Sequence, residues 1–431
     1  MTINEVVRNN LCMGCGVCAG VCTSNAIEMI KNDILGVYIP IIKTNSCKNC
    51  SLCIEICPGI KVDFDLLSKK FTSNNSNGGI IGPHISSYFS YSNNMNMRFH
   101  SSSGGLVTSL LALALKKKMI TGALVTKFSE TNPLKPVAFI ARSLSDITFS
   151  RSSKYLPVSI DNAVKEIIKS NGKYAVVGLP CQIHAIRKLE RVNNDIKNKI
   201  IFHFGLFCGH NNTFHSIEYF IKKSNIPVRT IKKLVFRDKG WPGRFLIETI
   251  NGQIHEFKRV RNESVLKKKI LFSQAFHRDF YIPRCLLCPD LTNELADISF
   301  GDAWNKRILN VDLIGTSLII TRNSIGEELF QLANKLEVIN SERIDEETVR
   351  KSQKPWFKEN TGSRIALWRF FGNMAPKYVG KNLRYNLFSM LIHSRILPYF
   401  THNKILWPFL KAFAFIRFPF SQLYLVLKKK E

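Results

Sequence analysis

The sequence predicts an α+β protein with a small cysteine-rich module, an α/β core and a helical, basic C-terminal extension. Three observations predict it. Eight of the 12 cysteines lie within the first 57 residues. Apolar runs that alternate between strand and helix periods follow them, and basic and aromatic residues dominate the C-terminal region. At 431 residues, of which 45% are hydrophobic, the chain is long enough for two to four domains with cores of their own.

Two cysteine runs near the N-terminus have the spacing of iron–sulfur ligands. Each run reads C-x2-C-x2-C-x3-C, and Pro58 follows the second. This is the bacterial ferredoxin pattern for two [4Fe–4S] clusters, in which the fourth cysteine of each run binds the other cluster. The expected first set is Cys12, Cys15, Cys18 and Cys57. The expected second set is Cys47, Cys50, Cys53 and Cys22. Disulfides or zinc are the alternatives, but zinc sites use paired C-x2-C knuckles rather than runs of four.

The cysteine content and the N-terminus bear on location. Twelve cysteines are too few for a disulfide scaffold of this size, and their clustering indicates metal binding in a reducing compartment. The segment ahead of the first cysteine, residues 1–11, is short and polar, unlike a secretory signal peptide. The sequence contains no run of about 18 uncharged apolar residues, so we expect no membrane-spanning helix. We therefore expect a cytoplasmic protein.

Composition divides the chain into segments. Residues 1–63 form the N-terminal module, in which 26–30 and 37–40 are expected strands. Serine, asparagine and glycine dominate much of 64–97, which is expected to be a linker. Residues 98–180 and 181–355 are the two parts of the core, and 356–431 are the extension.

The core begins with Ser101-Ser102-Ser103-Gly104-Gly105 ahead of an apolar helix over 106–118. Hydroxyls, free N–H groups and glycines at a helix start suit a phosphate, although a plain helix cap is the alternative. The other expected helices are 161–170, 182–191 and 326–338. The expected strands are 122–128, 136–142, 173–179, 199–206, 245–250, 296–302 and 317–322.

Four cysteines remain after the N-terminal eight. Cys181 and Cys208 follow two apolar strands of the type found in parallel sheets, where ligands gather beyond the carboxyl ends. Cys285 and Cys288 form a later C-x2-C pair. Four thiols are the number that one more [4Fe–4S] cluster requires, so we expect a third cluster. Zinc, and structural or redox-active thiols, remain the alternatives.

The charge of the chain is strongly positive, with a formal net charge of +29. Residues 361–431 hold twelve lysines and arginines against one acid, which contributes 12 − 1 = +11. Aromatic residues are interspersed with these cations, as in helices that lie on an anionic membrane surface. A helical cap on the core or on a partner is the alternative. Nucleic acid is not an expected partner, because no recognised binding motif accompanies the charge.

Five motifs in order carry a family resemblance. They are Ser-Ser-Ser-Gly-Gly at 101–105, Gly-Leu-Pro-Cys-Gln at 178–182, Phe-Cys-Gly-His at 207–210, Cys-x-x-Cys-Pro-Asp at 285–290 and Ala-Asp-Ile-Ser-Phe-Gly-Asp-Ala-Trp at 296–304. Together they resemble the beta subunits of coenzyme F420 hydrogenases and dehydrogenases over about residues 80–350. The arginine that is frequent before the serines in that family is His100 here.

The resemblance implies an α/β core that binds FAD behind a ferredoxin-like two-cluster module. It implies cofactor contacts at Ser102, Ser103, Gly104, Gly105, Lys154, Tyr155, Gly178, Pro180 and Asp302. It places the third cluster on Cys181, Cys208, Cys285 and Cys288. A flavin exchanges electron pairs with a substrate and single electrons with clusters, so the two cofactor types suit one another.

The expected function is that of an iron–sulfur flavoprotein oxidoreductase. It would exchange a hydride with coenzyme F420 or another small two-electron substrate, and electrons with a redox partner protein or ferredoxin. The alternative is a non-catalytic ferredoxin-type carrier or adaptor, peripheral to the membrane and serving polysaccharide biosynthesis. No catalytic proton donor is assigned: His184, His203 and His210 lie near the motifs, but such histidines are more often structural.

Overall fold

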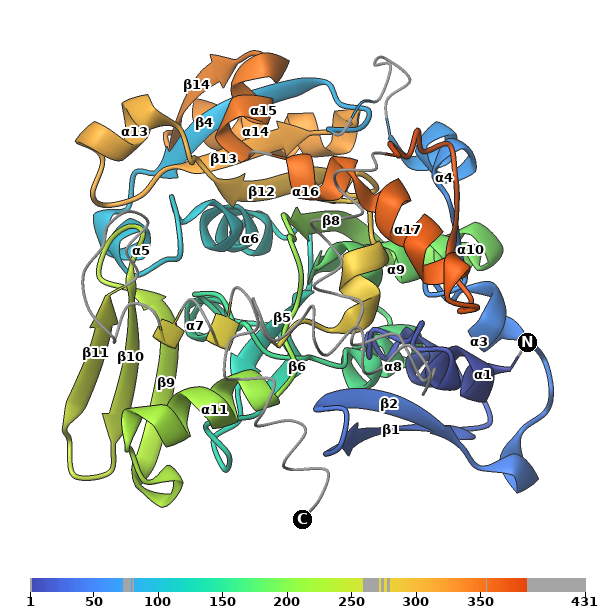
Figure 1. Cartoon of the computed structure of the whole chain (residues 1–431). Helices are drawn as coiled ribbons and strands as arrows, with labels where there is room; N and C mark the ends of the chain where they lie inside the picture. Colours follow the sequence, from blue (N-terminus) through green and yellow to red (C-terminus); the bar gives the residue numbers. More distant parts are fainter. Residues whose placement is uncertain are drawn as a thin grey trace.

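An eight-stranded mixed sheet forms the centre of the chain (Figure 1), in the order β14-β4-β13-β12-β8-β7-β5-β6. The computed structural model describes residues 2–72, 79, 81–258, 271–272, 275–276, 280–353 and 355–385. The strands of the sheet are β4 (Ser86–Ser92), β5 (Gly122–Phe128), β6 (Pro136–Ala141), β7 (Tyr174–Gly178), β8 (Ile200–Leu206), β12 (Ile298–Asp302), β13 (Ser317–Thr321) and β14 (Ile339–Ile344).

The middle of this sheet is parallel. Strands β5, β7, β8 and β12 pair in parallel, and antiparallel pairs flank them on both sides. Strands β7 and β8 are the two apolar runs that the sequence predicted as parallel neighbours, and they pair from Tyr174 to Gly178. Their carboxyl ends therefore meet at one edge, which brings the segments after Gly178 and Leu206 together.

Helices cover both faces of the sheet. Successive residues of a strand point to opposite faces, so Leu124 and Val176 enter one core and Ala123 and Ala175 the other. The first core packs against α8 (Asp161–Lys169), α9 (Pro180–Val192) and α10 (Asn194–Lys199). The second packs against α6 (Leu106–Lys116), α7 (Leu144–Phe149) and α14 (Ser324–Lys335).

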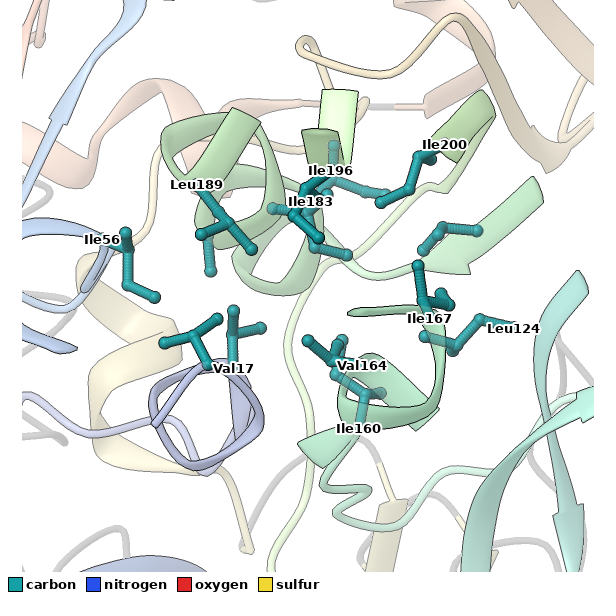
Figure 2. Close-up of a cluster of buried hydrophobic side chains, with 14 of the residues drawn as sticks. Val17, Ile56, Leu124, Ile160, Val164, Ile167, Ile183, Leu189, Ile196 and Ile200 are labelled. Atoms are coloured by element: carbon teal, nitrogen blue, oxygen red, sulfur yellow. The ribbon is translucent and has the colours of Figure 1, made fainter. Parts of the chain in front are cut away.

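The N-terminal module shares the first of these cores. Its elements are α1 (Ile3–Arg8), α2 (Val17–Gly20), β1 (Ile27–Asn32), β2 (Val37–Ile42), η1 (Thr44–Ser46), α3 (Leu52–Glu55) and β3 (Lys61–Asp63). Figure 2 shows Val17 and Ile56 of the module beside Val164 and Leu189 of the core helices. The antiparallel pair β1–β2 confirms both predicted strands.

The linker prediction for 64–97 is wrong where the structure describes these residues. Residues Phe64–Phe71 form α4, β4 lies inside the main sheet, and Met95–Phe99 form α5. In β4, serines alternate with aromatic residues, and Ser86, Ser87, Ser90 and Ser92 are all buried. Small serines let neighbouring segments approach this strand closely, so a serine-rich sequence here marks tight packing.

A second, three-stranded antiparallel sheet follows β8. It comprises β9 (Ile231–Asp238), β10 (Arg244–Thr249) and β11 (Ile254–Lys258) in the order β11-β10-β9. Its core is rich in phenylalanine and includes Phe220 from α11 (His215–Ser224), Phe236 and Phe245. Only the middle strand was predicted, over 245–250.

The beginning of the C-terminal extension packs on the core. Its elements are α16 (Trp356–Glu359), α17 (Thr361–Phe370) and β15 (Lys377–Val379), which follow α15 (Glu346–Gln353) at the end of the core, and β15 pairs in parallel with β3. Arg364 and Lys381 are held inside the structure, so they are not available to a membrane surface as the sequence analysis expected. The rest of that expectation falls on 386–431, outside the described residues.

Short elements complete the described chain. They are η2 (Val228–Thr230), η3 (Pro283–Leu287) and α13 (Lys306–Val311). Within the described residues, none of the helices combines the length and apolar character needed to cross a bilayer.

Candidate functional site

The four thiols of the expected first cluster line one apolar cavity. Cys12, Cys15, Cys18 and Cys57 are its only cysteines in the described chain, and Val17, Ile56 and Ala185 are among its other walls. Burial raises the pKa of Cys12 and of Cys15 to about 12. Without a bound metal such thiols stay protonated, so the thiolate forms of these cysteines require a positive partner such as bound iron.

Glycines shape the loop around this cavity. Gly14 and Gly16 have φ angles of +69° and +84°, which only glycine adopts readily. A Cβ at Gly14 would lie 2.7 Å from the Tyr38 carbonyl oxygen. The Gly14 N–H donates to Cys12 Sγ at 3.4 Å, the kind of hydrogen bond that tunes cluster potentials.

The second expected set lies nearer the surface. Burial raises the pKa of Cys53, and the neighbouring charges of Cys50, Cys47 and Cys22 raise it further. Cys22 Sγ accepts from the Ala26 N–H at 3.3 Å, and Cys50 is exposed. Cys22, the last cysteine of the first run, is thus electrostatically coupled to Cys53 of the second run, which agrees with its expected place in the second ligand set.

The four later cysteines also gather. Cys181 lies in the first turn of α9, Cys208 follows β8, and Cys285 lies in η3 with Cys288 just after it. Burial raises the pKa of Cys181 far above its usual value, and the charges of Cys15, Cys285, Cys208 and Cys288 add to this. These thiols thus form one buried electrostatic group although 107 positions separate the first from the last.

Two electrostatic interactions between sets order the three groups. The charge of Cys53 from the second set acts on Cys18 of the first. The charge of Cys15 from the first set acts on Cys181 of the third. The first set is therefore the middle one. Among the described residues no three His, Cys, Asp or Glu side chains converge as a single metal ion would require, whereas cubane thiolates bind separate irons and stand further apart.

Buried cations surround the first and third groups. Lys358 Nζ donates to the Cys288 carbonyl at 3.0 Å, and Arg284 Nη2 donates to the Pro58 carbonyl at 3.1 Å. Lys188 Nζ donates to the Cys57 carbonyl at 2.9 Å, and burial lowers its pKa to about 8. Although burial opposes the charge of Arg284, Tyr378 and the thiol of Cys288 hold its pKa above the usual value. These cations would offset the negative charge of clusters.

The serine–glycine segment lies between strands of the main sheet and the loop before α8. Gly105 caps α6 with a φ of +81°, as the helix prediction requires. Ser102 Oγ accepts from the Ser153 N–H at 2.8 Å, and Ser103 Oγ donates to the Thr316 carbonyl at 2.9 Å. A Cβ at Gly104 would lie 2.5 Å from the Ser90 carbonyl oxygen, so glycine is required there.

Three other predicted cofactor residues lie close to this segment. Lys154 is partly buried and donates to the carbonyls of Ser150, Arg151 and Ser152, while desolvation lowers its pKa to about 7. The ring of Tyr155 meets that of Phe236 edge-on. Asp302 pairs with Arg237 at 2.7 Å.

Two predicted cofactor residues, Gly178 and Pro180, lie at the end of β7, beside Cys181. The Gly178 carbonyl accepts from Asn293 Nδ2 at 2.9 Å, and Pro180 starts α9. In sequence they lie directly before Cys181, at the carboxyl end of β7.

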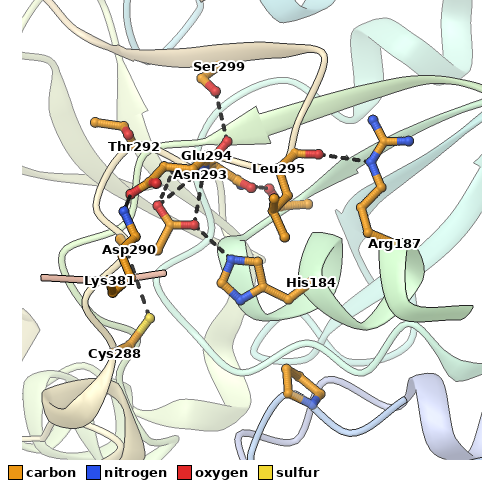
Figure 3. A network of polar contacts seen from close by, with 12 residues as sticks. His184, Arg187, Cys288, Asp290, Thr292, Asn293, Glu294, Leu295, Ser299 and Lys381 are labelled. Atoms are coloured by element: carbon orange, nitrogen blue, oxygen red, sulfur yellow. Dashed lines mark hydrogen bonds and ion pairs between the residues drawn. The ribbon is translucent and has the colours of Figure 1, made fainter. Parts of the chain in front are cut away.

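The histidines have structural partners, as expected. Figure 3 shows His184 on α9, hydrogen-bonded at 2.7 Å to Asp290, which closely follows Cys288. His203 is buried between Glu190 and Asp297, at 2.7 and 3.0 Å. Burial lowers the pKa of His210 to about 4.

Sequence reasoning missed several residues of the site. Arg237 was not singled out from the sequence, and Lys358 was included only as part of the basic C-terminal extension. The apolar strand ahead of Arg237 and the Gly-Trp-Pro-Gly turn after it could have marked that arginine. Nothing in the local sequence ties Lys358 to Cys285 and Cys288, because that contact depends on long-range folding.

Comparison with known proteins identifies the family. The family model "Coenzyme F420 hydrogenase/dehydrogenase, beta subunit" has two parts: the N-terminal part matches residues 88–165, and the C-terminal part matches residues 171–347. Together they cover more than half of the chain. This chain belongs to the family of coenzyme F420 hydrogenase/dehydrogenase beta subunits. The family resemblance stated from the motifs is confirmed.

Individual relatives of the family agree. A coenzyme F420 hydrogenase beta chain of Methanosarcina barkeri is 26% identical over 59% of this chain and 80% of its own length. A coenzyme F420-dependent sulfite reductase of Methanocaldococcus jannaschii is 28% identical over 61% of this chain, but the match spans only 39% of that protein. An uncharacterised protein of the same archaeon is 31% identical over 58% of this chain and 65% of its own length.

A solved structure shares the fold. One chain of the F420-reducing [NiFe] hydrogenase complex from Methanosarcina barkeri matches 69% of this chain and 97% of its own, with a TM-score of 0.54 and 24% identity. This likeness supports the mixed α/β architecture of the chain, for which the sequence predicted an α/β core but not the mixed eight-stranded sheet.

Proposed function

We propose that this chain is an iron–sulfur flavoprotein oxidoreductase that passes electrons between three [4Fe–4S] clusters and FAD and exchanges a hydride with coenzyme F420 or another two-electron substrate. The supporting observation is the grouping of all twelve thiols into three sets of four, joined through Cys18–Cys53 and Cys15–Cys181. Relatives named as components of F420 hydrogenase and F420H2 dehydrogenase support the substrate class.

The chain's own residues prepare these sites. The twelve thiolates would hold the clusters, and apolar walls such as Val17 and Ile56 exclude water from the first. Ser102 and the first turn of α6 would hold the phosphates of FAD, because no side chain caps the N–H groups at this helix N-terminus, and Gly104, whose N–H donates to Ser317 Oγ, lets the segment pack closely against the sheet. When bound, the flavin supplies the step between paired and single electrons. A redox partner protein would dock near the exposed Cys50.

Anaerobic purification and turnover test this proposal. We expect about twelve irons per chain and one flavin released on denaturation. Reduced F420, NADH and reduced ferredoxin are then supplied in parallel, and we expect F420 or one of the others to bleach the flavin. Iron far below eight per chain without any flavin would refute the proposal. Cluster reduction without flavin would instead support an electron carrier.

A further inference from the structure

The end of β9 and the turn that follows it each carry one buried hydrogen-bond donor that no acceptor meets within the described structure. Arg237 Nη2 and Trp241 Nε1 both lack a hydrogen-bond partner within the described structure. Both residues are buried, with 3% of the surface of Arg237 and 4% of that of Trp241 exposed. Leaving such donors unpaired is unfavourable. Two of them only four positions apart indicate that an acceptor belongs there.

The rest of the Arg237 side chain is fixed. Its Nη1 donates to Asp302 at 2.7 Å and its Nε to the Pro242 carbonyl at 3.2 Å. Although burial opposes the charge of Arg237, Asp302 and Tyr155 hold its pKa above the usual value. Ser152 Oγ donates to the Arg237 carbonyl at 2.7 Å, which ties this turn to the loop before α8. The guanidinium is thus charged and held in place, so its remaining N–H bonds have a set direction.

The turn also packs on the serine–glycine segment. The N–H groups of Gly240 and Trp241 donate to the carbonyls of Phe99 and Leu313, each at 2.8 Å. Gly315 contacts both sides: a Cβ there would lie 2.7 Å from the Ser103 carbonyl oxygen and 3.3 Å from Trp241 Cβ. The free donors therefore belong to the same neighbourhood as the proposed phosphate-binding residues.

We propose that Arg237 and Trp241 bind the oxygens of a phosphoryl group, together with Ser102 and the N-terminus of α6. These groups are donors, so the ligand must be rich in acceptors, and the uncapped N-terminus of α6 favours an anion. The inference rests on the proposed function and adds two residues to it. The phosphoryl group has two possible sources: the pyrophosphate of FAD and the phosphodiester of coenzyme F420.

Binding measurements on the full-length, reconstituted protein test this. Trp241→Phe removes the indole N–H and keeps an aromatic ring against Trp304. Arg237→Met removes the guanidinium. Arg244→Met is the matched control, because that arginine is exposed and pairs with Glu256 instead. Thermal unfolding of each variant checks that it folds.

We expect each test variant, and not the control, to weaken the ligand about tenfold or more. A weaker FAD complex assigns the FAD pyrophosphate. Unchanged FAD binding with a higher KM for reduced F420 assigns the F420 phosphodiester. FAD affinity and KM both within twofold of wild type in folded variants would overturn the inference and leave a structural arginine.

Inorganic pyrophosphate separates this inference from the proposed function. If the wild-type protein binds no flavin, the proposed function fails, but pyrophosphate can still be tested by thermal stabilisation. Stabilisation of the wild type that both variants lose would support the phosphoryl site. No stabilisation of a flavin-free wild type would overturn it.

Discussion

Replacing Arg284 should lower the reduction potentials of two clusters at once. The guanidinium is 1% exposed and donates to the carbonyl that follows Cys57, while its own residue neighbours Cys285. Its charge acts on the thiols of Cys57 in the first group and of Cys285 and Cys288 in the third. A buried cation between two centres stabilises the reduced, more negative form of each.

The size of the shift follows from Coulomb's law. At an effective dielectric constant of about 20 and a charge separation of about 7 Å, one unit charge contributes about 2.4 kcal/mol. For a one-electron couple this is on the order of 100 mV, since about 59 mV corresponds to a tenfold change. Arg284→Met should therefore lower both potentials by on the order of 100 mV, and Arg284→Lys, which keeps the charge, by much less.

EPR-monitored redox titration measures these potentials. Arg191→Met is the control, because that arginine is partly exposed and pairs with Glu55 on the surface of the N-terminal module, where solvent screens its charge. The control should move the potentials little. If Arg284→Met shifts neither cluster by more than the control does, Arg284 does not lie electrically between the two centres.

Three other outcomes are expected. Cys181→Ser should reduce iron from about twelve to about eight per chain, whereas loss of all iron would contradict three separate sets. Gly104→Ala should abolish flavin retention, because the added Cβ would lie 2.5 Å from the Ser90 carbonyl oxygen. Gly209→Ala is the control and should retain flavin, because a Cβ there would meet no atom within 4 Å. Equal flavin retention by the two variants would contradict a role of Gly104 in flavin binding. Ile56→Ala should lower the unfolding free energy by about 2–5 kcal/mol, with circular dichroism and cluster absorbance changing together; separate transitions would show an independent module.

Much of the fold could be predicted because the signals are local. The apolar runs of β7 and β8 and the helix after Gly105 follow directly from composition and period. The cysteine sets could be predicted because a cubane constrains spacing along the chain. Even the crossed place of Cys22 and Cys57 follows from that constraint.

The rest depends on contacts that sequence does not display. The serines of β4 resemble a linker, yet they fill a crowded sheet interior where larger side chains would not fit. Arg237 becomes part of a site only because Asp302, 65 positions away, holds it. Lys358 meets Cys285 and Cys288 only after the extension folds back.

The pairing of β15 with β3 has a consequence for biosynthesis. Val62 lies beside Tyr378, so the edge of the N-terminal module is completed by residues that leave the ribosome more than 300 positions later. A nascent chain therefore holds its first eight cysteines long before it has the strand that pairs with β3. A chain that stops before Lys377 would lack this strand, and the β3 edge of the module would remain unpaired.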